Sequence, residues 1–431
     1  MKTIKLVMVI VISLNAQNED TLSKEDKLYG LSKLWMETTY NFAFFHQVPD
    51  LDWDSTFQAF IPKVLDTNND WDYYLELQKF MALLQDGHTR AFPPVTLRHK
   101  YYGTATQSIV TRLIEGKVII TQVVASTLKD KGLKQGMEIV SIENMDVFDY
   151  AETHVSPIVY ASTAHDLNLQ KYGHFLLSGS PSKPIQIEVK DFNGNIKTYA
   201  IDRGPWILEH TLFTGKQWEF EILPDNIGYL KTYNFVDNEQ YRPKFDSLYQ
   251  EILTTDGLII DVRNNVGGAT QIAYYILKHF TDKPFKSVNW RTPNNISAHR
   301  AWGSGIKWME VEGKDIKPHQ DRPIYTKPLN VLAGAGSFSG AEDFCVGFLT
   351  MKRGKLIGSK TAGSSGSPMM FSLHGNDDLM LICTKQDFFP DGKEFIGFGI
   401  SPDIEVRTTI KDVIENRDPV LNVAIKDILE K

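Results

Sequence analysis

Two glycine-rich loops of the chain hold the groups that could carry out acyl-transfer chemistry. The first loop spans residues 261–268 and contains the pair Gly267-Gly268, while the second spans residues 334–342 and contains Ser339. Paired glycines permit positive φ angles and leave backbone N–H groups uncovered. A serine at a strand-to-helix turn lies at the positive end of the helix, where its hydroxyl can act as a nucleophile.

A structural role would explain the same serine. Ser339 and Glu342 fit the capping-box pattern Ser-x-x-Glu, in which the hydroxyl accepts a hydrogen bond from an amide of the first helical turn. Gly334-x-Gly336 does not support a dinucleotide site, because Ser339 occupies the position of the third glycine. The local pattern leaves both a catalytic and a capping Ser339 open.

His88 is the candidate base for such a serine. It follows a predicted helix whose apolar residues share one face: Tyr73, Leu77, Phe80, Met81 and Leu84. Asn69 can cap the start of this helix, and Gly87 suits a left-handed stop that would put His88 directly after the helix C-terminus. A neutral imidazole can accept a serine proton when the groups lie about 3 Å apart, and a helix C-terminus favours the imidazolium formed during attack. The alternative is a histidine that caps its own helix.

Other polar residues give weaker indications. Asp261 and Arg263 lie two residues apart, and such a pair more often positions a loop than performs catalysis. Cys345 falls on the apolar side of the predicted helix after Ser339, which favours a buried free thiol over a nucleophile. The histidines show no close metal-binding spacing, so we predict no metal or organic cofactor.

The composition of the 431-residue chain is that of an ordinary globular protein, with 42% hydrophobic and 23% charged residues. The balance of 46 Lys+Arg against 53 Asp+Glu gives a net charge of −7 without a basic tract, so nucleic acid is not an expected partner. The two cysteines are too few for a disulfide scaffold. Residues 1–16 combine lysines, an apolar run and a small residue, which predicts a secretory signal peptide, and the run is too short to span a membrane. A buried first strand is the alternative.

Three regions must position these groups. Residues 17–100 are predicted to be helical, and residues 206–431 alternate strands with helices. In the second of these regions, continuous apolar strands predict a parallel sheet covered on both faces, at residues 227–232, 258–262 and 329–333. Ligands in such sheets bind beyond the carboxyl ends of the strands, which is where both glycine loops fall.

The middle region, residues 101–205, is predicted to be rich in β-strands. A strand at residues 116–124 precedes a short helix, a turn with Gly132 and Gly136, and a further strand. This spacing resembles a PDZ domain, although Met137 stands where that family usually has Asp. The alternative is a small β-rich spacer.

Five motifs then occur in a fixed order: Asp86-Gly87-His88-Thr89, Asp261-Val262-Arg263-Asn264-Asn265-Val266-Gly267-Gly268, Ser339-Gly340-Ala341-Glu342, Ile357-Gly358-Ser359-Lys360-Thr361-Ala362-Gly363 and Gly399-Ile400-Ser401-Pro402-Asp403. In this order they resemble the S41 serine peptidases, a family that includes the C-terminal processing proteases and the tricorn core protease. The resemblance covers residues 25–425. It implies an α+β multidomain fold with a helical N-terminal region, a PDZ-like insert and an α/β catalytic domain of the ClpP/crotonase type.

The resemblance also implies roles for individual residues. Ser339 would be the nucleophile, and the N–H groups of Gly340 and of Gly267 or Gly268 would form the oxyanion hole. Processing proteases of this family use a lysine base just after the Thr-x-Gly of the fourth motif. That position here is Ser364, and Lys360 does not match it.

His88 matches the base of the tricorn-like branch of the family. In that branch, a serine directly before the histidine helps to orient the imidazole through a glutamate, whereas this sequence has Gly87. Glu394, shortly before the fifth motif, is the residue we predict to orient His88. A solvated loop carboxylate beside Lys393 is the alternative for Glu394.

The sequence thus predicts an exported serine endopeptidase, periplasmic or extracellular, that acts on peptides or unfolded proteins. We expect no nucleic-acid partner and no stable membrane span, and a homo-oligomer is left open. One alternative is a non-catalytic protein that binds peptides or hydrophobic ligands on the same fold. The others are an enzyme with a lysine base and a scaffold that has lost activity.

Overall fold

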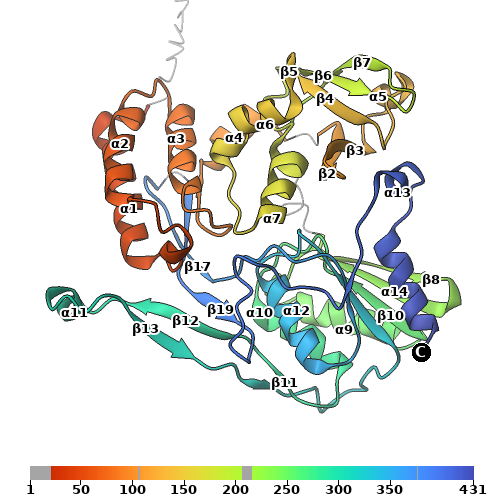
Figure 1. Ribbon diagram of the computed structural model, residues 1–431. Helices are drawn as coiled ribbons and strands as arrows, with labels where there is room; N and C mark the ends of the chain where they lie inside the picture. The colour runs from red at the N-terminus through yellow and green to blue at the C-terminus, as the bar shows by residue number, and fades with distance from the viewer. Residues whose placement is uncertain (1–20, 105–106, 206–215, 376) are drawn as a thin grey trace, which may run out of the picture.

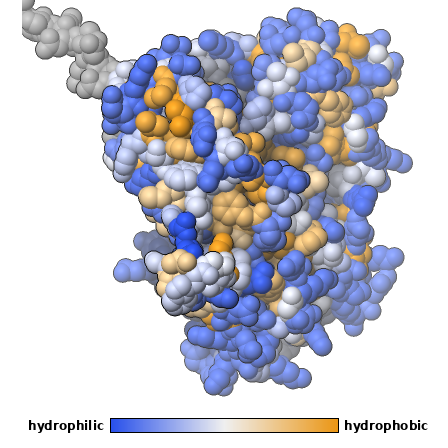
Figure 2. Space-filling view, turned by 60° about the vertical axis from the view of Figure 1, so that its left-hand side comes forward, coloured by the Kyte–Doolittle hydropathy of each residue, from blue (hydrophilic) through white to orange (hydrophobic). Residues whose placement is uncertain are grey.

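The computed structural model describes residues 21–104, 107–205, 216–375 and 377–431 (Figure 1). The predicted signal peptide at residues 1–16 lies outside these ranges. Among the described residues, no helix has both the length and the hydrophobicity that a membrane span requires. On the face seen in Figure 2, hydrophobic side chains lie in separate patches among hydrophilic ones.

The N-terminal region is helical, as predicted. Its elements are α1 (Lys24–Asn41), η1 (Phe45–Gln47), α2 (Trp53–Leu65), α3 (Asp70–Ala82), β1 (Arg90–Phe92) and α4 (Val95–Tyr102). Asn69 caps α3, because its side chain accepts a hydrogen bond from the Asp72 N–H at 2.9 Å. The apolar face of α3 predicted from the sequence is buried in the largest hydrophobic core.

The end of α3 differs from the prediction. The helix stops at Ala82, and the amides of Leu84 and Gln85 bond to carbonyls three residues back, which tightens the last turn. Gln85, not Gly87, takes the left-handed conformation, with φ 50°. His88 therefore lies in a loop beyond the helix, and the expected influence of a helix C-terminus on its charge does not apply.

The middle region forms a separate antiparallel sheet of order β2-β3-β4-β6-β7, with β5 paired to β4. Its strands are β2 (Ile109–Ile114), β3 (Lys117–Val123), β4 (Glu138–Ile142), β5 (Met145–Asp146), β6 (Ile185–Lys190) and β7 (Ile196–Ile201). Its helices are α5 (Ser126–Asp130), α6 (Val147–His154), η2 (Ser156–Ile158), α7 (Ala164–Leu169) and the π-helix η3 (Gln170–Phe175). This region has its own hydrophobic core and lies above the large sheet in Figure 1.

The C-terminal region is built on a six-stranded sheet of order β20-β16-β15-β10-β9-β8. Its strands are β8 (Trp218–Leu223), β9 (Ile227–Thr232), β10 (Gly257–Asp261), β15 (Leu329–Ala333), β16 (Leu356–Gly358) and β20 (Ile404–Glu405). All neighbouring strands are parallel except β8 and β9.

Helices cover both faces of this sheet, as the apolar strands predict. The elements are η4 (Pro224–Asn226), α9 (Tyr241–Ile252), α10 (Thr270–Leu277), η5 (Lys278–Phe280), α12 (Gly340–Met351), α13 (Ile410–Ile414) and α14 (Pro419–Leu429). Ile259 packs in a core with residues of α14, while its neighbours Leu258 and Ile260 pack in the core that contains α9, α10 and α12. The alternation along β10 therefore buries both sides of the strand.

One smaller sheet joins the helical region to the C-terminal region, and two others lie within the C-terminal region. They contain β11 (Phe285–Lys286), β12 (Asn289–Asn294), β13 (Lys307–Val311), β14 (Asp315–Ile316), β17 (Pro368–Phe371), β18 (Leu379–Cys383) and β19 (Gln386–Phe388), with α11 (Ser297–Ala301) between β12 and β13. The short strand β1 pairs with β18 in the order β1-β18-β17. This pairing fixes the segment just after His88 to the C-terminal region.

Candidate active site

Ser339 lies between β15 and α12, beyond the carboxyl ends of the parallel strands, where the sequence predicts the site. Its backbone has φ 57° and ψ −126°, a conformation that non-glycine residues rarely adopt and that is often found at functional sites. Its hydroxyl makes no helix-capping hydrogen bond. The Ser339 Oγ lies 2.9 Å from His88 Nε2 instead, so the structure does not support the capping alternative.

His88 is buried, and both of its ring nitrogens face a serine hydroxyl. Nε2 faces Ser339 and Nδ1 lies 2.9 Å from Ser364 Oγ. The ring of Phe338 stacks on the imidazole with the centroids 4.4 Å apart. Burial lowers the pKa of His88 to about 3, and the charges of Arg90 and Lys385 act in the same direction. The resting imidazole is therefore neutral, the form that can accept a proton.

The loop that carries His88 is anchored by its neighbours in sequence and in space. The Asp86 carboxylate accepts hydrogen bonds from the His88 N–H at 3.2 Å and from the Thr89 hydroxyl at 2.6 Å. Thr89 Oγ1 in turn accepts a hydrogen bond from the Cys383 N–H in β18 at 3.1 Å. Together with the β1-β18 pairing, these contacts hold the imidazole against the second glycine loop.

Ser364 is fixed through its backbone as well as its hydroxyl. Its carbonyl accepts a hydrogen bond from the Ser339 N–H at 3.0 Å, and its own N–H donates to Glu342 Oε2 at 2.7 Å. The Glu342 carboxyl also accepts from the Gly363 N–H at 2.8 Å and from the Thr361 hydroxyl at 2.6 Å. Burial raises the pKa of Glu342 to about 8, although these donors oppose the shift. Glu342 thus organises the turn that presents Ser364 to His88.

Gly87 leaves the space that Ser364 occupies. A Cβ atom at position 87 would lie 2.6 Å from Ser364 Oγ and 2.9 Å from an atom of the Phe338 ring. The serine that precedes the histidine in the tricorn-like pattern would therefore collide with the serine that is present at position 364. The hydroxyl beside Nδ1 comes from a different part of the chain.

The structure does not bring Glu394 to His88. Glu394 is exposed, and its charge acts on His46, whose pKa it tends to raise. The ring atom that Glu394 was expected to orient already faces Ser364. We therefore correct this assignment. Glu394 follows the turn after β19 and forms a β-bridge with Phe388.

Two backbone N–H groups lie beside the Ser339 hydroxyl. In the described part of the chain, the amides of Gly268 and Gly340 donate no hydrogen bond, and both residues line the cavity that contains Ser339 and His88. The Gly267 N–H differs, since it donates to Asn265 Oδ1 at 2.8 Å. Of the two glycines predicted as alternatives, Gly268 is thus the one with an available donor.

Gly267 is required for the close approach of the two loops. A Cβ at this position, where φ is 86°, would lie 2.6 Å from Ser339 Cβ and from the Gly340 nitrogen. A side chain here would push the first loop away from the nucleophile, whatever its chemical type.

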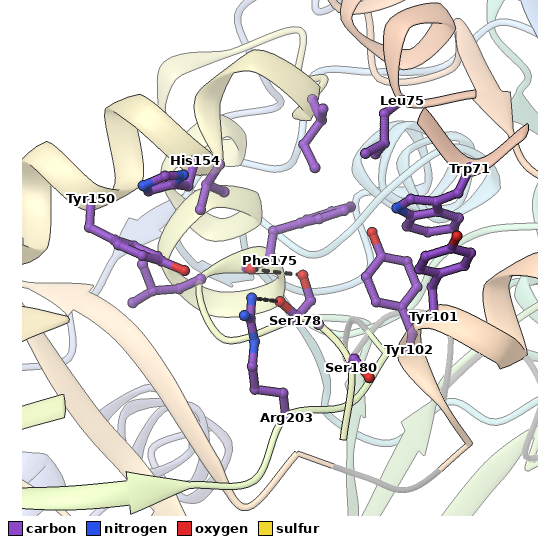
Figure 3. Close-up of a pocket in the computed structure, with 14 residues that line it drawn as sticks. Trp71, Leu75, Tyr101, Tyr102, Tyr150, His154, Phe175, Ser178, Ser180 and Arg203 are labelled. Carbon is purple, nitrogen blue, oxygen red and sulfur yellow. Dashed lines mark hydrogen bonds between the residues drawn. The ribbon is translucent and has the colours of Figure 1, made fainter. Parts of the chain in front are cut away.

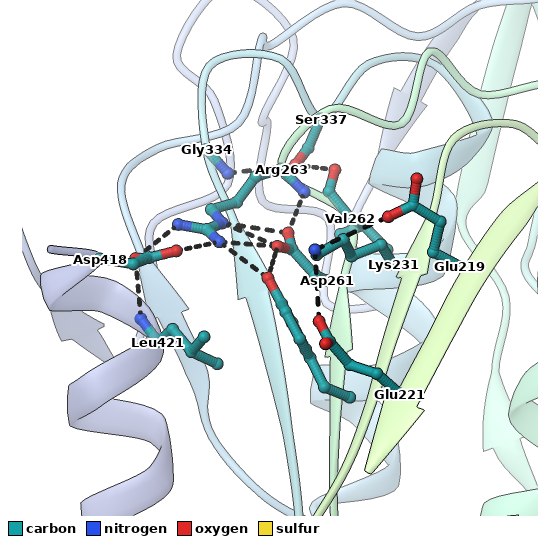
Figure 4. A network of polar contacts seen from close by, with 11 residues as sticks. Glu219, Glu221, Lys231, Asp261, Val262, Arg263, Gly334, Ser337, Asp418 and Leu421 are labelled. Carbon is teal, nitrogen blue, oxygen red and sulfur yellow. Dashed lines mark hydrogen bonds and ion pairs between the residues drawn. The ribbon is translucent and has the colours of Figure 1, made fainter. Parts of the chain in front are cut away.

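Asp261 and Arg263 position the first loop, as expected for such a pair (Figure 4). The Arg263 guanidinium lies 2.7 Å from Asp261 Oδ2 and 2.7 Å from Asp418 Oδ2 at the start of α14. Ser337 ties the second loop to the same place, because its hydroxyl donates to the Val262 carbonyl at 2.7 Å. Cys345 is fully buried, as predicted.

The middle region also contacts the active-site loops. The Thr163 hydroxyl donates to the Ala362 carbonyl at 2.9 Å, and His165 Nε2 donates to the Thr361 carbonyl at 2.6 Å. Ser162 accepts from the Gly87 N–H at 3.1 Å and donates to the Asp86 carboxylate at 3.2 Å. The segment before α7 therefore braces both the His88 loop and the Ser364 loop.

A second cavity of about 310 Å³ lies between the helical and middle regions (Figure 3). Its wall is largely aromatic, with Trp71 stacked on Tyr101 at 4.3 Å, and Arg203 reaches across it to the Ser178 carbonyl. It shares no lining residue with the cavity at Ser339. We assign it no part in the serine chemistry.

Some residues of the Ser339 cavity were not found from the sequence. Asp343 and Lys385 line it, and Lys385 forms an ion pair of 2.6 Å with the buried Asp387. The spacing of Asp343, one helical turn after Ser339, is a signal that could have been read. The position of Lys385, between β18 and β19, depends on the long-range pairing of β18 with β1 and of β19 with β12, and it has no local signal. Lys360, considered as a base, is exposed.

The contact between the half-buried Ser339 and the buried His88 is an arrangement that serine-type peptidases use. Residues 226–406, which contain the large parallel sheet and both glycine loops, match the model of peptidase family S41. The match is confined to this part of the chain, and it confirms the resemblance drawn from the motifs found there.

Individual relatives are distant in sequence. The chain is 24% identical over 240 residues to a "Probable CtpA-like serine protease" of Staphylococcus epidermidis, covering 54% of this chain and 45% of the relative. It is 26% identical over 232 residues to a protein of the same description from Staphylococcus haemolyticus, covering 53% and 43%. The chain thus spans about half the length of the curated relatives it matches.

A solved structure is similar over nearly the whole chain. Mature CPAF complexed with lactacystin has a TM-score of 0.72 at 15% identity, covering 94% of this chain and 98% of that chain. At this level of identity, the likeness shows the mixed α/β multi-sheet fold.

Proposed function

We propose that the chain is an exported serine endopeptidase in which Ser339 is the nucleophile and His88 the general base. The observation that carries this proposal is the 2.9 Å distance between Ser339 Oγ and His88 Nε2, across 251 positions of sequence. Free amides of Gly268 and Gly340 at the same cavity supply the second element that acyl transfer needs.

The reaction follows from the positions of these groups. The Ser339 oxygen attacks a peptide carbonyl as its proton passes to His88 Nε2, and the carbonyl oxygen becomes an oxyanion between the two amides. The imidazolium then gives its proton to the leaving amine, so the C–N bond breaks and an acyl ester remains on Ser339. Water, activated by the same imidazole, hydrolyses the ester and regenerates the serine. Each oxyanion donor contributes on the order of 3 kcal/mol to such a transition state.

Ser364 takes the orienting role in this proposal. With its proton on Nδ1, the imidazole donates to Ser364 Oγ, which leaves Nε2 free to accept from Ser339. Glu342 acts one step further away by holding the Ser364 backbone. This arrangement replaces the glutamate that we expected at Glu394.

The finer features of the sequence prediction form part of the same proposal. A six-stranded antiparallel sheet within residues 101–205 supports a PDZ-like insert, and the mostly parallel sheet after residue 206 supports a ClpP/crotonase-like catalytic domain. The apolar run after two lysines supports export to the periplasm or the extracellular space. Substrates would be peptides or unfolded protein, and the homo-oligomer stays open.

The alternatives have less support. The aromatic cavity of about 310 Å³ would suit a small hydrophobic ligand, which is the observation in favour of a binding protein. That function gives no reason for a strained serine in contact with a buried neutral histidine. A lysine base has no candidate among the described residues of the cavity other than Lys385. Its ion pairs, with Asp387 foremost, raise the pKa of that lysine against the effect of burial and keep it charged.

Labelling with a fluorophosphonate tests the nucleophile directly. We expect the parent protein to be labelled, Ser339→Ala to show no labelling, and His88→Ala to lose most of the rate. Ser359→Ala and His99→Ala are matched controls outside the cavity and should label like the parent. Labelling of Ser339→Ala at the parent rate would refute the assignment.

A further inference from the structure

The cavity beside Ser339 has an unusual electrostatic composition. It has a volume of about 250 Å³, smaller than a typical site for a drug-sized ligand. Its lining residues are His88, Gly268, Thr270, Ser339, Gly340, Asp343, Ser365, Ser367, Pro368, Met370 and Lys385. The size suits one substrate side chain together with the adjoining backbone.

Asp343 brings a carboxylate to this cavity from the first turn of α12. Ser339 directly precedes that helix, with a non-helical backbone, so the two residues lie four positions apart at the start of α12. Asp343 is buried, with 3% of the residue exposed.

One oxygen of this carboxylate has no partner. Asp343 Oδ2 accepts a hydrogen bond from the Thr270 hydroxyl at 2.5 Å, whereas Oδ1 is buried without a hydrogen bond in the described part of the chain. Burying an unsatisfied carboxylate oxygen is costly, and native proteins keep few such groups. Because Asp343 lines the cavity beside the nucleophile, this unpartnered oxygen is suited to a ligand that brings its own donor.

The neighbouring charges leave this carboxylate unbalanced. Lys385 is the cation of the cavity, and its Nζ lies 2.6 Å from Asp387 Oδ1, while the Ser365 hydroxyl donates to Asp387 Oδ2 at 2.7 Å. The charge of Lys385 also acts on Asp343, so one ammonium group faces two carboxylates. Burial raises the pKa of Asp343 to about 6, which leaves the carboxylate ionised at neutral pH. Because His88 is neutral at rest, this group of charges carries one surplus negative charge.

We propose that Asp343 makes this cavity a specificity pocket for a lysine or arginine side chain next to the scissile bond. The inference depends on the proposed function and names its substrate class. An ammonium or guanidinium group would donate to Asp343 Oδ1 and balance its charge. An aliphatic side chain of the same length would leave Oδ1 unsatisfied, and sites built for a hydrogen bond discriminate strongly against such analogues.

The test compares substrates that differ at one atom group. Internally quenched peptides with acetylated amino termini carry lysine, arginine, norleucine or glutamate at each position flanking the cleaved bond. We expect kcat/KM for lysine or arginine to exceed that for norleucine at least tenfold at one flanking position, and glutamate to be the poorest substrate. Termini of a digested unfolded protein, identified by mass spectrometry, should show the same residues. Loss of cleavage on acetylation would instead assign Asp343 to a terminal ammonium and overturn the side-chain assignment.

Variants locate the preference in the carboxylate. Asp343→Asn keeps the size of the side chain and should reduce the lysine-to-norleucine ratio toward one. Asp282→Asn, which changes an exposed aspartate that does not line the cavity, is the control and should keep the parent ratio.

The outcomes separate the two proposals. If the parent protein is labelled and hydrolyses peptides without a preference for cationic side chains, the role of Asp343 is refuted and the proposed peptidase function is retained. An unchanged preference in Asp343→Asn would do the same. No labelling and no hydrolysis would remove both. The parent ratio alone decides the matter if Asp343→Asn fails to fold.

Discussion

Removal of the Ser364 hydroxyl should lower kcat measurably, although this residue does not line the substrate cavity. Ser364→Ala removes the group 2.9 Å from His88 Nδ1 and leaves that buried ring atom without a partner. An unsatisfied buried donor costs about 1–3 kcal/mol. If that cost destabilises the His88 tautomer that carries its proton on Nδ1 and accepts at Nε2, kcat should drop about 5- to 150-fold.

The loss should appear in kcat, with KM little changed. Ser364 contributes nothing to the walls of the cavity, and the backbone contacts that it makes with Ser339 and Glu342 remain in the alanine variant. Ser359→Ala, on the same segment but outside this network, is the matched control. Steady-state kinetics on a quenched peptide, with fluorophosphonate labelling rates beside them, measure both quantities.

A double substitution tests the reasoning more sharply. Gly87→Ser places a Cβ 2.6 Å from Ser364 Oγ and should displace the imidazole, so it should reduce activity more than Ser364→Ala does. Adding Ser364→Gly removes that collision and lets the serine at position 87 approach the ring. The double variant should therefore exceed Gly87→Ser in activity, with a coupling energy of about 0.5–3 kcal/mol. Strict additivity, or a Ser364→Ala enzyme with full kcat, would refute the role given to this hydroxyl.

Three further predictions follow from the buried titratable groups His88 and Glu342 and from the close contact at Gly267. Because the pKa of His88 is lowered to about 3, the protonation that abolishes the base should require acid, so kcat/KM should persist below pH 6.5 and fall only toward pH 3; an acid limb at or above pH 6.5 would contradict this. The pKa of Glu342 in the folded state is raised to about 8, so the folded state binds this proton more tightly than the unfolded state does. The stability that this contributes is lost as the pH rises from about 4.5 to 8. In a series of Tm measurements against pH, Glu342→Gln should abolish that decline, and Glu415→Gln is the exposed control. Gly267→Ala should lower Tm and labelling together, since its Cβ would meet the Gly340 nitrogen at 2.6 Å, whereas Gly303→Ala, which has a similar φ and open space, should lower neither as much.

The sequence predicted the elements that depend on local pattern. The strands before both glycine loops, the helix after Ser339 and the cap at Asn69 are present because apolar periodicity and capping chemistry are encoded over a few residues. The order of motifs then indicated that Ser339 and His88 belong to one site. No local pattern carries that information, since the contact spans 251 positions.

The residue that orients His88 was predicted wrongly. Glu394 was inferred from its distance along the chain to a motif, but the partner of Nδ1 is set by which turn reaches the ring in space. Gly87 was interpreted as a helix stop, whereas its lack of a side chain matters because Ser364 needs the room. Glu342 was interpreted as a capping residue, and its carboxyl instead holds the turn of residues 361–364. In each case a residue suited to a local role serves a tertiary contact.

The cavity contains two groups that are unfavourable while it is empty and that a substrate would satisfy. His88 is neutral because burial penalises its charge, yet attack by Ser339 requires it to become imidazolium. The oxyanion that forms at the same moment supplies the missing negative charge beside it. Asp343 presents the opposite case, a buried carboxylate whose free oxygen lacks a donor until a cation arrives. The two deficits are therefore compensated at different stages. The negative charge beside His88 appears only as the oxyanion forms, so it stabilises the transition state and can raise kcat, whereas the contact of a substrate cation with Asp343 is made on binding and favours binding and selectivity.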